Sequence, residues 1–328
     1  MLPNRRSLTL LLRTTLLGGT LLGGALSGSS AKAADGQTAV STRGPVEKLQ
    51  GGFQFTEGPT YASDNSGAGE GALYFSDIPA NTIYVRRGDS QAEPFIQPSG
   101  HANGLFVEAG GRLLACQMDG QVVAYDLKTK KPTTLAATYE GARFNAPNDL
   151  VIDQAGGVYF TDPLFRAPEP LPQKVQAFYY LSTDGKVSRV SGDLPAPNGI
   201  ALSPQGDRLY LIPSRSAEML VYDVVGPGQL SKPSVFCKLR QKQAEENAGG
   251  DGMVVDTAGN LYITSNLGVQ VFSPGGEFLT LIEVPEQPAN VTFGGPERDT
   301  LYITARNGLY AVRLSTKGLP TPKLRVGE

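Results

Sequence analysis

This sequence of 328 residues contains one histidine, lacks two common catalytic and cofactor-binding motifs, and has no long stretch of helical periodicity. His101 is the only histidine, which excludes the His-Glu-x-x-His zinc centre, because that centre needs two histidines. The Gly-x-Ser-x-Gly nucleophile elbow and the Gly-x-Gly-x-x-Gly turn of dinucleotide-binding folds are also absent. Since no long stretch has helical periodicity, a mainly helical fold is excluded as well.

Charge is scarce too, at 18% charged residues and a net charge of −2. The first 33 residues carry four basic groups and no acidic one, and the remaining chain carries 25 basic and 31 acidic residues, a net charge of −6. Nucleic acids and anionic membranes bind basic surfaces, so neither is an expected partner. Forty glycines and 24 prolines fit a fold with many tight turns.

The N-terminal residues have the pattern of an export signal. Arg5 and Arg6 precede an apolar, Gly-rich stretch at 8–26, and small residues around Ala33 offer a cleavage site. The paired arginines resemble a twin-arginine signal. A membrane anchor is the alternative, but frequent Gly, Thr and Ser make a weak permanent span. We expect a signal peptide at 1–33, a linker at 34–44, no stable membrane span after cleavage, and a periplasmic or secreted protein.

The two cysteines, Cys116 and Cys237, are 121 residues apart. A disulfide is conceivable in an exported protein. They fall, however, in different repeats and in different strands of the pattern described next. Two separate thiols are therefore expected.

A polar residue, an apolar strand, a turn and an aromatic strand recur six times along the chain. The repeats begin at Glu57, Asn103, Asn148, Asn198, Asp251 and Asn290. The steps between these residues are 46, 45, 50, 53 and 39 residues. A period of about 40–50 residues with several short strands is typical of propeller blades. The sequence therefore predicts an all-β fold, a six-bladed β-propeller with about four antiparallel strands in each blade.

The last repeat lacks a fourth strand, whereas the strand-like segment at 46–53 belongs to no repeat. Pairing this segment with the last blade would close the ring and cover an exposed sheet edge. We expect it to form the outer strand of the blade that contains Leu301. The propeller should then span residues 45–315 and leave a C-terminal tail at 316–328.

First strands of propeller blades line the central axis and start on one face, so the six polar residues should surround one mouth of the channel. Two carboxylates, Glu57 and Asp251, together with four amides provide oxygen ligands that suit Ca²⁺ or Mg²⁺ better than Zn²⁺. The alternative is that Asn and Asp only begin strands, because both favour turns. Their common register favours a site, since buried carboxylates without an ion would leave charge unpaired.

Three more polar residues fall close to this predicted ring. His101 precedes Asn103 by two residues and is a candidate for a hydrogen bond at the rim. Asp149 either orients a substrate or only stabilises its turn, and Arg143 either binds an anionic substrate or pairs with a surface carboxylate. The loop at 162–176 contains four prolines and is a candidate lid over the mouth.

Six short motifs carry a family resemblance: Glu57-Gly58-Pro59, Asn145-Ala146-Pro147-Asn148-Asp149, Thr161-Asp162-Pro163, Pro197-Asn198-Gly199, Asp251-Gly252-Met253 and Ala289-Asn290-Val291. In this order they resemble the gluconolactonase, senescence-marker-protein and luciferin-regenerating-enzyme family, over about residues 46–314. The resemblance implies a six-bladed propeller that hydrolyses lactones with one axial divalent cation, which is often Ca²⁺, with Zn²⁺ and Mg²⁺ as open alternatives.

The same resemblance implies roles for individual residues. The metal ligands would be Glu57, Asn148, Asn198 and Asp251. Asp251 would also be the catalytic acid and base, and the metal would polarise the lactone carbonyl. The resemblance gives Asn148, Asp149 and Arg143 as substrate contacts. Asn103 and His101 are added as substrate contacts because they fall at the predicted mouth, although the stretch from His101 to Gly104 departs from the pattern of many relatives. Among residues that could deprotonate water, Asp251 is preferred to Asp149 and His101, because its register places it on the axis.

The sequence thus predicts a gluconolactonase-like hydrolase whose partner is a small lactone or sugar acid. Two alternatives stay open. One is an esterase of the paraoxonase or fluorophosphatase type that uses the same metal ring. The other is a non-catalytic propeller that binds a sugar or another ligand, because a fold does not fix a function.

Overall fold

The computed structural model of the chain describes residues 40–63, 71–192, 194–242 and 248–326. All of them belong to one compact unit, Ala39–Glu328. The predicted signal peptide at 1–33 and most of the predicted linker at 34–44 lie outside the described residues, so both stay predictions. Every element of regular structure in the described ranges is a β-strand. No helix there is long and apolar enough to cross a membrane.

Twenty-four of the strands form six blades of four. The first, innermost strands are β2 (Thr56–Ala62), β6 (Ala102–Val107), β12 (Leu150–Ile152), β16 (Pro197–Leu202), β21 (Met253–Val255) and β25 (Pro288–Gly294). The second strands are β3 (Ala72–Asp77), β7 (Arg112–Gln117), β13 (Val158–Asp162), β17 (Arg208–Pro213), β22 (Leu261–Ser265) and β26 (Thr300–Ala305). The third strands are β4 (Thr82–Arg87), β8 (Gln121–Asp126), β14 (Ala177–Leu181), β18 (Glu218–Gly226), β23 (Gly268–Phe272) and β27 (Gly308–Arg313). The fourth, outer strands are β5 (Glu93–Ile96), β9 (Pro132–Ala136), β15 (Val187–Gly192), β20 (Ser234–Lys238), β24 (Phe278–Ile282) and β1 (Glu47–Gly51).

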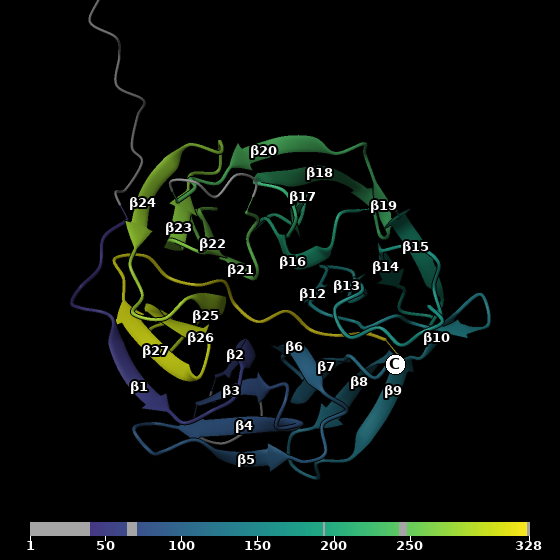
Figure 1. Cartoon of the computed structure of the whole chain (residues 1–328), viewed down its shortest axis with the longest axis horizontal. Helices are drawn as coiled ribbons and strands as arrows, with labels where there is room; N and C mark the ends of the chain where they lie inside the picture. The colour runs from purple at the N-terminus through teal and green to yellow at the C-terminus, as the bar shows by residue number, and fades with distance from the viewer. Residues whose placement is uncertain (1–39, 64–70, 193, 243–247, 327–328) are drawn as a thin grey trace, which may run out of the picture. The chain divides into compact units, whose positions relative to one another are not determined.

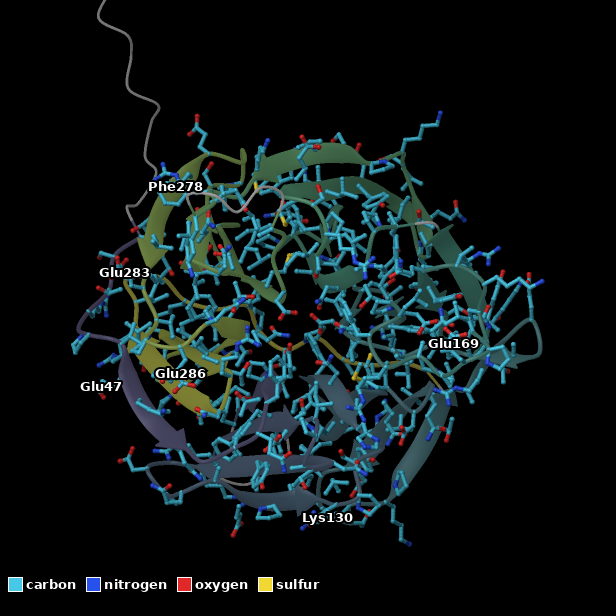
Figure 2. All side chains as sticks on the ribbon, viewed as in Figure 1. Glu47, Lys130, Glu169, Phe278, Glu283 and Glu286 are labelled. Atoms are coloured by element: carbon cyan, nitrogen blue, oxygen red, sulfur yellow. The ribbon has the colours of Figure 1, made fainter. Side chains whose placement is uncertain are left out.

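Each blade is an antiparallel sheet whose strands pair in the order first, second, third and fourth. Figure 1 shows the six sheets arranged as a ring, with the first strands nearest the axis and the fourth strands at the circumference. The charged residues Glu47, Lys130 and Glu283 lie at this outer edge (Figure 2). The arrangement confirms the six-bladed propeller predicted from the repeats.

The N-terminal strand closes the ring, as predicted. β1 pairs antiparallel with β27, and Lys48 lies opposite Tyr310. β27 in turn pairs with β26, the strand that contains Leu301. The final sheet therefore runs β1-β27-β26-β25 and joins the two ends of the repeat region in one blade.

Both faces of every blade are buried, which explains why the second strands are continuously apolar. Successive side chains of a strand point to opposite faces of its sheet. Leu113 accordingly packs into the core between the first two blades, and Leu114 packs into the core between the second and third. A cluster of buried apolar residues fills each of the six interfaces between neighbouring blades.

Smaller features were not predicted. A two-stranded sheet of β10 (Thr138–Tyr139) and β11 (Ala142–Arg143) precedes the third blade, and β19 (Gln229–Leu230) extends the hairpin of β18. Cys116 and Cys237 are both buried and free, so the expectation of two separate thiols is confirmed.

The last described residues, 317–326, cross the end of the propeller opposite the starts of the first strands; we call them the C-terminal strap. Thr257 N donates to Lys317 O at 2.8 Å on the fifth blade. Ala109 N donates to Pro322 O at 2.9 Å on the second blade. Leu324 is fully buried in the cluster between the second and third blades. Figure 1 shows this yellow segment running across the ring to the C-terminus.

Candidate active site

A cavity of 490 Å³ opens at the mouth where the first strands begin. Five of the six polar residues predicted for this mouth line it: Glu57, Asn103, Asn148, Asn198 and Asp251. Each lies at or just before the start of a first strand, so the repeat brings one polar side chain from each of five blades to the same place. Ser214, at the end of the second strand of blade four, joins them.

Asn198 and Asp251 are directly hydrogen-bonded. Asn198 Nδ2 donates to Asp251 Oδ1 at 2.6 Å and is also 3.0 Å from Ser214 Oγ. Ser214 Oγ in turn donates to Gly250 O at 2.8 Å. Because these contacts engage the amide nitrogen of Asn198, its amide oxygen points away from Asp251 Oδ1 and Ser214 Oγ. The contacts therefore fix the orientation of both Asn198 and Asp251 at the mouth.

Burial disfavours the charged form of the two carboxyl groups. Burial, followed by repulsion from Asp251, raises the pKa of Glu57 well above its usual range, although the Gly58 N–H at 3.0 Å opposes the shift. Burial also raises the pKa of Asp251, and the hydrogen bond from Asn198 and the charge of Arg306 oppose that shift. The mouth therefore places two carboxyl groups in surroundings that a cation would stabilise.

Close backbone packing explains the glycines that follow these residues. Gly252 N donates to Ala289 O at 2.8 Å, and a Cβ at Gly252 would lie 2.1 Å from the Asn290 side chain. Gly58 has φ of +47°, and a Cβ there would lie 2.0 Å from Asn103 O. Neighbouring blades thus approach each other so closely at the ring that a side chain would separate them.

Asn290, the sixth residue of the predicted ring, lies on its channel side: it lines a second cavity, and its side chain hydrogen-bonds Glu57 and Asp149. Its Oδ1 accepts a hydrogen bond from Val291 N at 2.8 Å, which turns the side chain along the channel. This second cavity has a volume of 370 Å³ and lies within the channel between the first strands. Residues 319–322 of the C-terminal strap line its far end.

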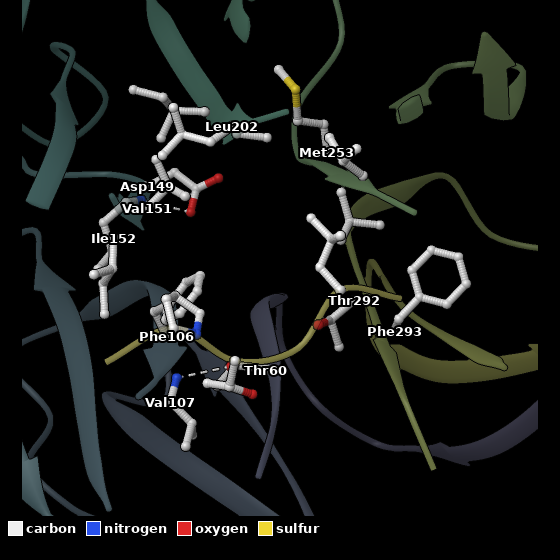
Figure 3. A pocket seen from close by; sticks show the side chains of 18 of the residues that line it. Thr60, Phe106, Val107, Asp149, Val151, Ile152, Leu202, Met253, Thr292 and Phe293 are labelled. Atoms are coloured by element: carbon white, nitrogen blue, oxygen red, sulfur yellow. Dashed lines mark hydrogen bonds between the residues drawn. The ribbon is translucent and has the colours of Figure 1, made fainter. Parts of the chain in front are cut away.

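Asp149 also faces the channel cavity, and Figure 3 shows its carboxylate directed into the space between the first strands. Its Oδ1 accepts a hydrogen bond from Leu150 N at 2.9 Å. Burial raises the pKa of Asp149 to about 7, while backbone donors and the Asn290 side chain oppose the shift. Asp149 therefore lies on the channel side of the ring, and its predicted contact with substrate stays a prediction.

His101 and Arg143 do not line the mouth among the described residues. His101 Nδ1 lies 3.0 Å from Asp119 Oδ1, which agrees with a hydrogen bond at the rim. Arg143 is held by backbone carbonyls: Nε donates to Phe144 O at 3.0 Å, and an Nη2 N–H donates to Met118 O at 3.2 Å. Arg143 thus stabilises the loop that carries Asn148, and its predicted substrate contact remains untested.

The pattern of the sequence did not indicate which residues of the loop at 162–176 reach the mouth. Phe165 and Arg166 from this loop line the mouth, so the part of the loop that reaches the site is now identified. Asp162 anchors the start of the blade instead, since its two oxygens accept hydrogen bonds from Asn145 N at 2.9 Å and Ala146 N at 2.7 Å. Only the proline content of the loop was available as a signal, and it does not say which side chain turns inward.

A divalent cation fits the donor set at the mouth. Within the described residues no group of three or more His, Cys, Asp and Glu side chains could hold a metal. A site here would therefore combine the carboxylates of Glu57 and Asp251 with amide oxygens of Asn148 and Asn198, which line the same cavity. All four ligands are oxygens, the ligand type that Ca²⁺ prefers.

Comparison with known proteins gives a consistent result. The family described as "SMP-30/Gluconolactonase/LRE-like region" matches residues 55–307. The gluconolactonase of Zymomonas mobilis is 31% identical over 298 residues, which cover 84% of this chain and 82% of that protein. The solved structure of a gluconolactonase from Xanthomonas campestris superposes with a TM-score of 0.73 at 27% identity, covering 82% of this chain and 89% of that one. Regucalcin of Agrobacterium tumefaciens, described as a calcium-binding protein, shares the fold with a TM-score of 0.73 at 20% identity, covering 87% and 98% of the two chains.

Proposed function

Because the chain belongs to the SMP-30/gluconolactonase/LRE-like family, we propose that it is a divalent-metal-dependent hydrolase that opens the ring of a sugar lactone. The observation that carries the proposal is the convergence of Glu57, Asn148, Asn198 and Asp251 on one cavity at the channel mouth. A cavity of 490 Å³ is within the range of about 300–1,000 Å³ that small-molecule sites occupy. Relatives named gluconolactonase support the substrate class.

The four donors would hold the cation, and Ca²⁺ is the ion that we propose. When bound, it would polarise the carbonyl of the ester and stabilise negative charge on the carbonyl oxygen. Regucalcin, the calcium-binding relative in fold, is consistent with this ion. The raised pKa values of Glu57 and Asp251 support a cation as well, because burial outweighs the hydrogen bonds at both groups and the charge of Arg306 at Asp251.

Asp251 is the residue that we assign as acid and base. It takes a proton from the attacking water, whose oxygen bonds to the carbonyl carbon. The bond between this carbon and the ring oxygen then breaks, and Asp251 returns the proton to the leaving alkoxide. The product is the open hydroxy acid. The hydrogen bond from Asn198 at 2.6 Å holds the Asp251 carboxylate in a fixed orientation during both transfers.

The amides of Asn103 and Asn148 would bind the hydroxyl groups of the sugar. Both side chains line the mouth, on the second and third blades, in the same cavity as the Asn198–Asp251 pair on the fourth and fifth. An amide both donates and accepts hydrogen bonds, so it can bind a hydroxyl in either role.

Metal analysis combined with a panel of small lactones tests this proposal. We expect about one bound divalent ion per chain, lactone hydrolysis that a chelator abolishes, and recovery with Ca²⁺. Glu57→Gln should weaken metal binding without unfolding the protein. Glu283→Gln, at the outer edge of the ring, is the matched control and should bind metal normally. Hydrolysis that survives complete metal removal would refute the metal dependence, and binding of lactones without turnover would favour the non-catalytic alternative.

We further propose that the chain is exported and cleaved near Ala33. The basic start, apolar core and small residues at 31–33 support this assignment. N-terminal sequencing of the protein from the expressing cell checks it. A protein that keeps residues 1–33 would contradict cleavage.

A further inference from the structure

The mouth has a negative floor and a single positive group at its edge. Glu57 and Asp251 supply the carboxylates. Among the described residues that line the mouth, Arg166 is the only Lys, Arg or His. It comes from the loop between β13 and β14, opposite in charge to the ring beneath it. The proposed cation would neutralise these carboxylates, so Arg166 is the charged side chain of the mouth that stays without an opposite charge in the same lining.

Arg166 differs from Arg143 and Arg306, because its side chain is exposed and not engaged by the described part of the protein. The Arg143 guanidinium is held by carbonyls of its own loop. The Arg306 guanidinium donates to Gln287 and packs over the ring of Phe55, 5.6 Å from its centroid. Among the described residues that line the mouth, Arg166 thus supplies the one guanidinium that is free to bind a ligand.

The backbone at Arg166 is also unusual. Its φ is +132°, in a region that favours glycine, and Arg166 N donates to Leu164 O at 3.0 Å. A non-glycine residue in a sparsely populated region costs about 1–3 kcal/mol, and such residues cluster at ligand-binding sites. The position carries a long cationic side chain where glycine would cost less, which fits a role in binding.

We propose that Arg166 determines specificity by binding an anionic group at the end of the substrate remote from the lactone ring. This inference rests on the proposed lactone hydrolysis. The group would be a carboxylate, sulfonate or phosphate, since a guanidinium binds each of these through two parallel hydrogen bonds. The ring residues and the proposed cation act on the ester, so an anionic group held by Arg166 orients the substrate with its ester toward Asp251.

A matched pair of substrates tests the proposal: glucono-1,5-lactone and the same lactone with a phosphate on its terminal hydroxyl. The readout is the ratio of kcat/KM for the phosphorylated lactone to kcat/KM for the neutral one, corrected for spontaneous hydrolysis. In Arg166→Gln we expect this ratio to fall by about five- to tenfold, the size of one charged hydrogen-bonded contact at a partly exposed site. Arg166→Lys should give an intermediate ratio because it keeps the charge and loses the planar fork.

Arg87→Gln is the control. Arg87 is a half-buried arginine of β4 that pairs with Glu93 at 3.1 Å and does not line the mouth, so the ratio should equal that of the wild type. Salt gives a second readout. Between ionic strengths of about 0.01 M and 1 M the screening length falls from about 30 Å to 3 Å. The ratio should therefore fall with salt in the wild type and change far less in Arg166→Gln.

An unchanged ratio in Arg166→Gln, with both lactones still hydrolysed, would overturn the role of Arg166 and leave the proposed function intact. An equal loss of kcat/KM on both lactones would also overturn it. The arginine would then act on the loop at 162–176 itself, or on the carboxylate that both lactones release on opening. If the wild type hydrolyses no lactone, the proposed function fails instead. Calorimetry with gluconate and 6-phosphogluconate then decides the inference separately: tighter binding of the phosphate by the wild type, lost in Arg166→Gln, supports it, and equal binding refutes it.

Discussion

Burial opposes the ionisation of Glu57 and Asp251, and the two carboxyl groups oppose each other across the mouth. The polar atoms around them are mostly hydrogen-bond donors: the Gly58 N–H at Glu57 and the Asn198 amide at Asp251. Donors of this kind stabilise a carboxylate only in part. A divalent cation held between these residues would remove the remaining cost, and this argument from charge is independent of the family relationship.

Asp251→Asn removes the proposed acid and base while it keeps the size of the side chain. We expect the variant to fold and to keep some metal, because Glu57 and the amides remain. Lactone turnover should fall by about 10²–10⁴-fold, the usual effect of a lost general base. Steady-state kinetics, with metal content measured on the same sample, checks this prediction. Near-normal turnover in Asp251→Asn together with an inactive His101→Ala would transfer the role to His101.

The pKa shifts predict how Ca²⁺ stabilises the protein at different pH values. Glu57, Asp149 and Asp251 all have folded-state pKa values above the value of about 4 for an exposed carboxyl group, and that of Asp149 is about 7. The folded protein therefore binds more protons than the unfolded chain between these values. The free energy of unfolding that these three groups contribute is fully present below a pH of about 4. It decreases as the pH rises toward about 7, because the folded protein then has to ionise buried carboxyl groups.

In the metal-free protein, the ionisation of these three carboxyl groups should accordingly make the fold less stable at pH 7.5 than at pH 5. Ca²⁺ binds the ionised carboxylates, so it should raise the Tm more at pH 7.5 than at pH 5. Thermal melts with and without Ca²⁺ at both pH values measure the difference. Glu57→Gln should reduce the gain at pH 7.5. An equal gain at the two pH values would show that Ca²⁺ binds away from these carboxyl groups.

At the scale of strands, the repeat made most of the fold predictable. Second strands are apolar on both faces because each blade is covered on both sides, and Tyr159 and Phe160 pack into different interfaces. Such uninterrupted apolar strands are easy to find in a sequence. The same regularity located the starts of the first strands and therefore the residues of the ring.

Orientation within the site was less predictable, because a single hydrogen bond decides it. Asn290 has the same place in its repeat as Asn198, yet its Oδ1 accepts from Val291 N and the side chain lines the channel cavity. Asn198 donates to Asp251 instead and lines the mouth. Arg166 belongs to an irregular loop with no repeat to give its register. Neither outcome follows from residue type or spacing.

Among the described residues, the interface at which the ring closes has the fewest buried apolar side chains, so the pairing of β1 with β27 should matter for stability. The cluster between the first and last blades has four buried members, Phe53, Leu73, Phe75 and Leu309. A protein that begins at residue 52 would keep this cluster but leave the edge of β27 unpaired. We expect a lower Tm and concentration-dependent aggregation, since an open edge pairs with other chains.

A protein that begins at residue 40 is the control, because it keeps β1 and its pairing with β27. Melting curves and light scattering at several concentrations compare the two. The closure argument would be wrong if both proteins melted at the same temperature and stayed monomeric.

Across the whole molecule, the C-terminal strap joins blades that lie far apart in the ring. Gly318 N donates to Arg298 O at 2.8 Å beside the last blade, and Arg325 N donates to Gly156 O at 3.0 Å beside the third. Leu324 N also donates to the buried carboxylate of Glu108 at 3.2 Å. The strap thus covers the end of the channel opposite the ring and ties the two sides of the propeller together.

Removing the strap should therefore destabilise the fold and spare the chemistry. A chain that stops after Thr316 loses the burial of Leu324 and Val326, which corresponds to about 3–6 kcal/mol for two large apolar side chains. It also opens the channel cavity, whose far end the strap lines. The mouth lies at the other end of the first strands, so KM for a lactone should change by less than about twofold, well below the effect of one lost contact.

Urea denaturation and steady-state kinetics on the truncated chain test this prediction together. A chain that stops after Val326 is the control and should match the full-length protein. Leu324→Ala should reproduce part of the loss, about 2–5 kcal/mol, because it leaves a cavity in the cluster between the second and third blades. If truncation after Thr316 raised KM strongly while stability stayed unchanged, the strap would act on the mouth through the channel. Asn290 would be the residue that transmits the effect, because it lines the channel and its side chain hydrogen-bonds Glu57 of the ring.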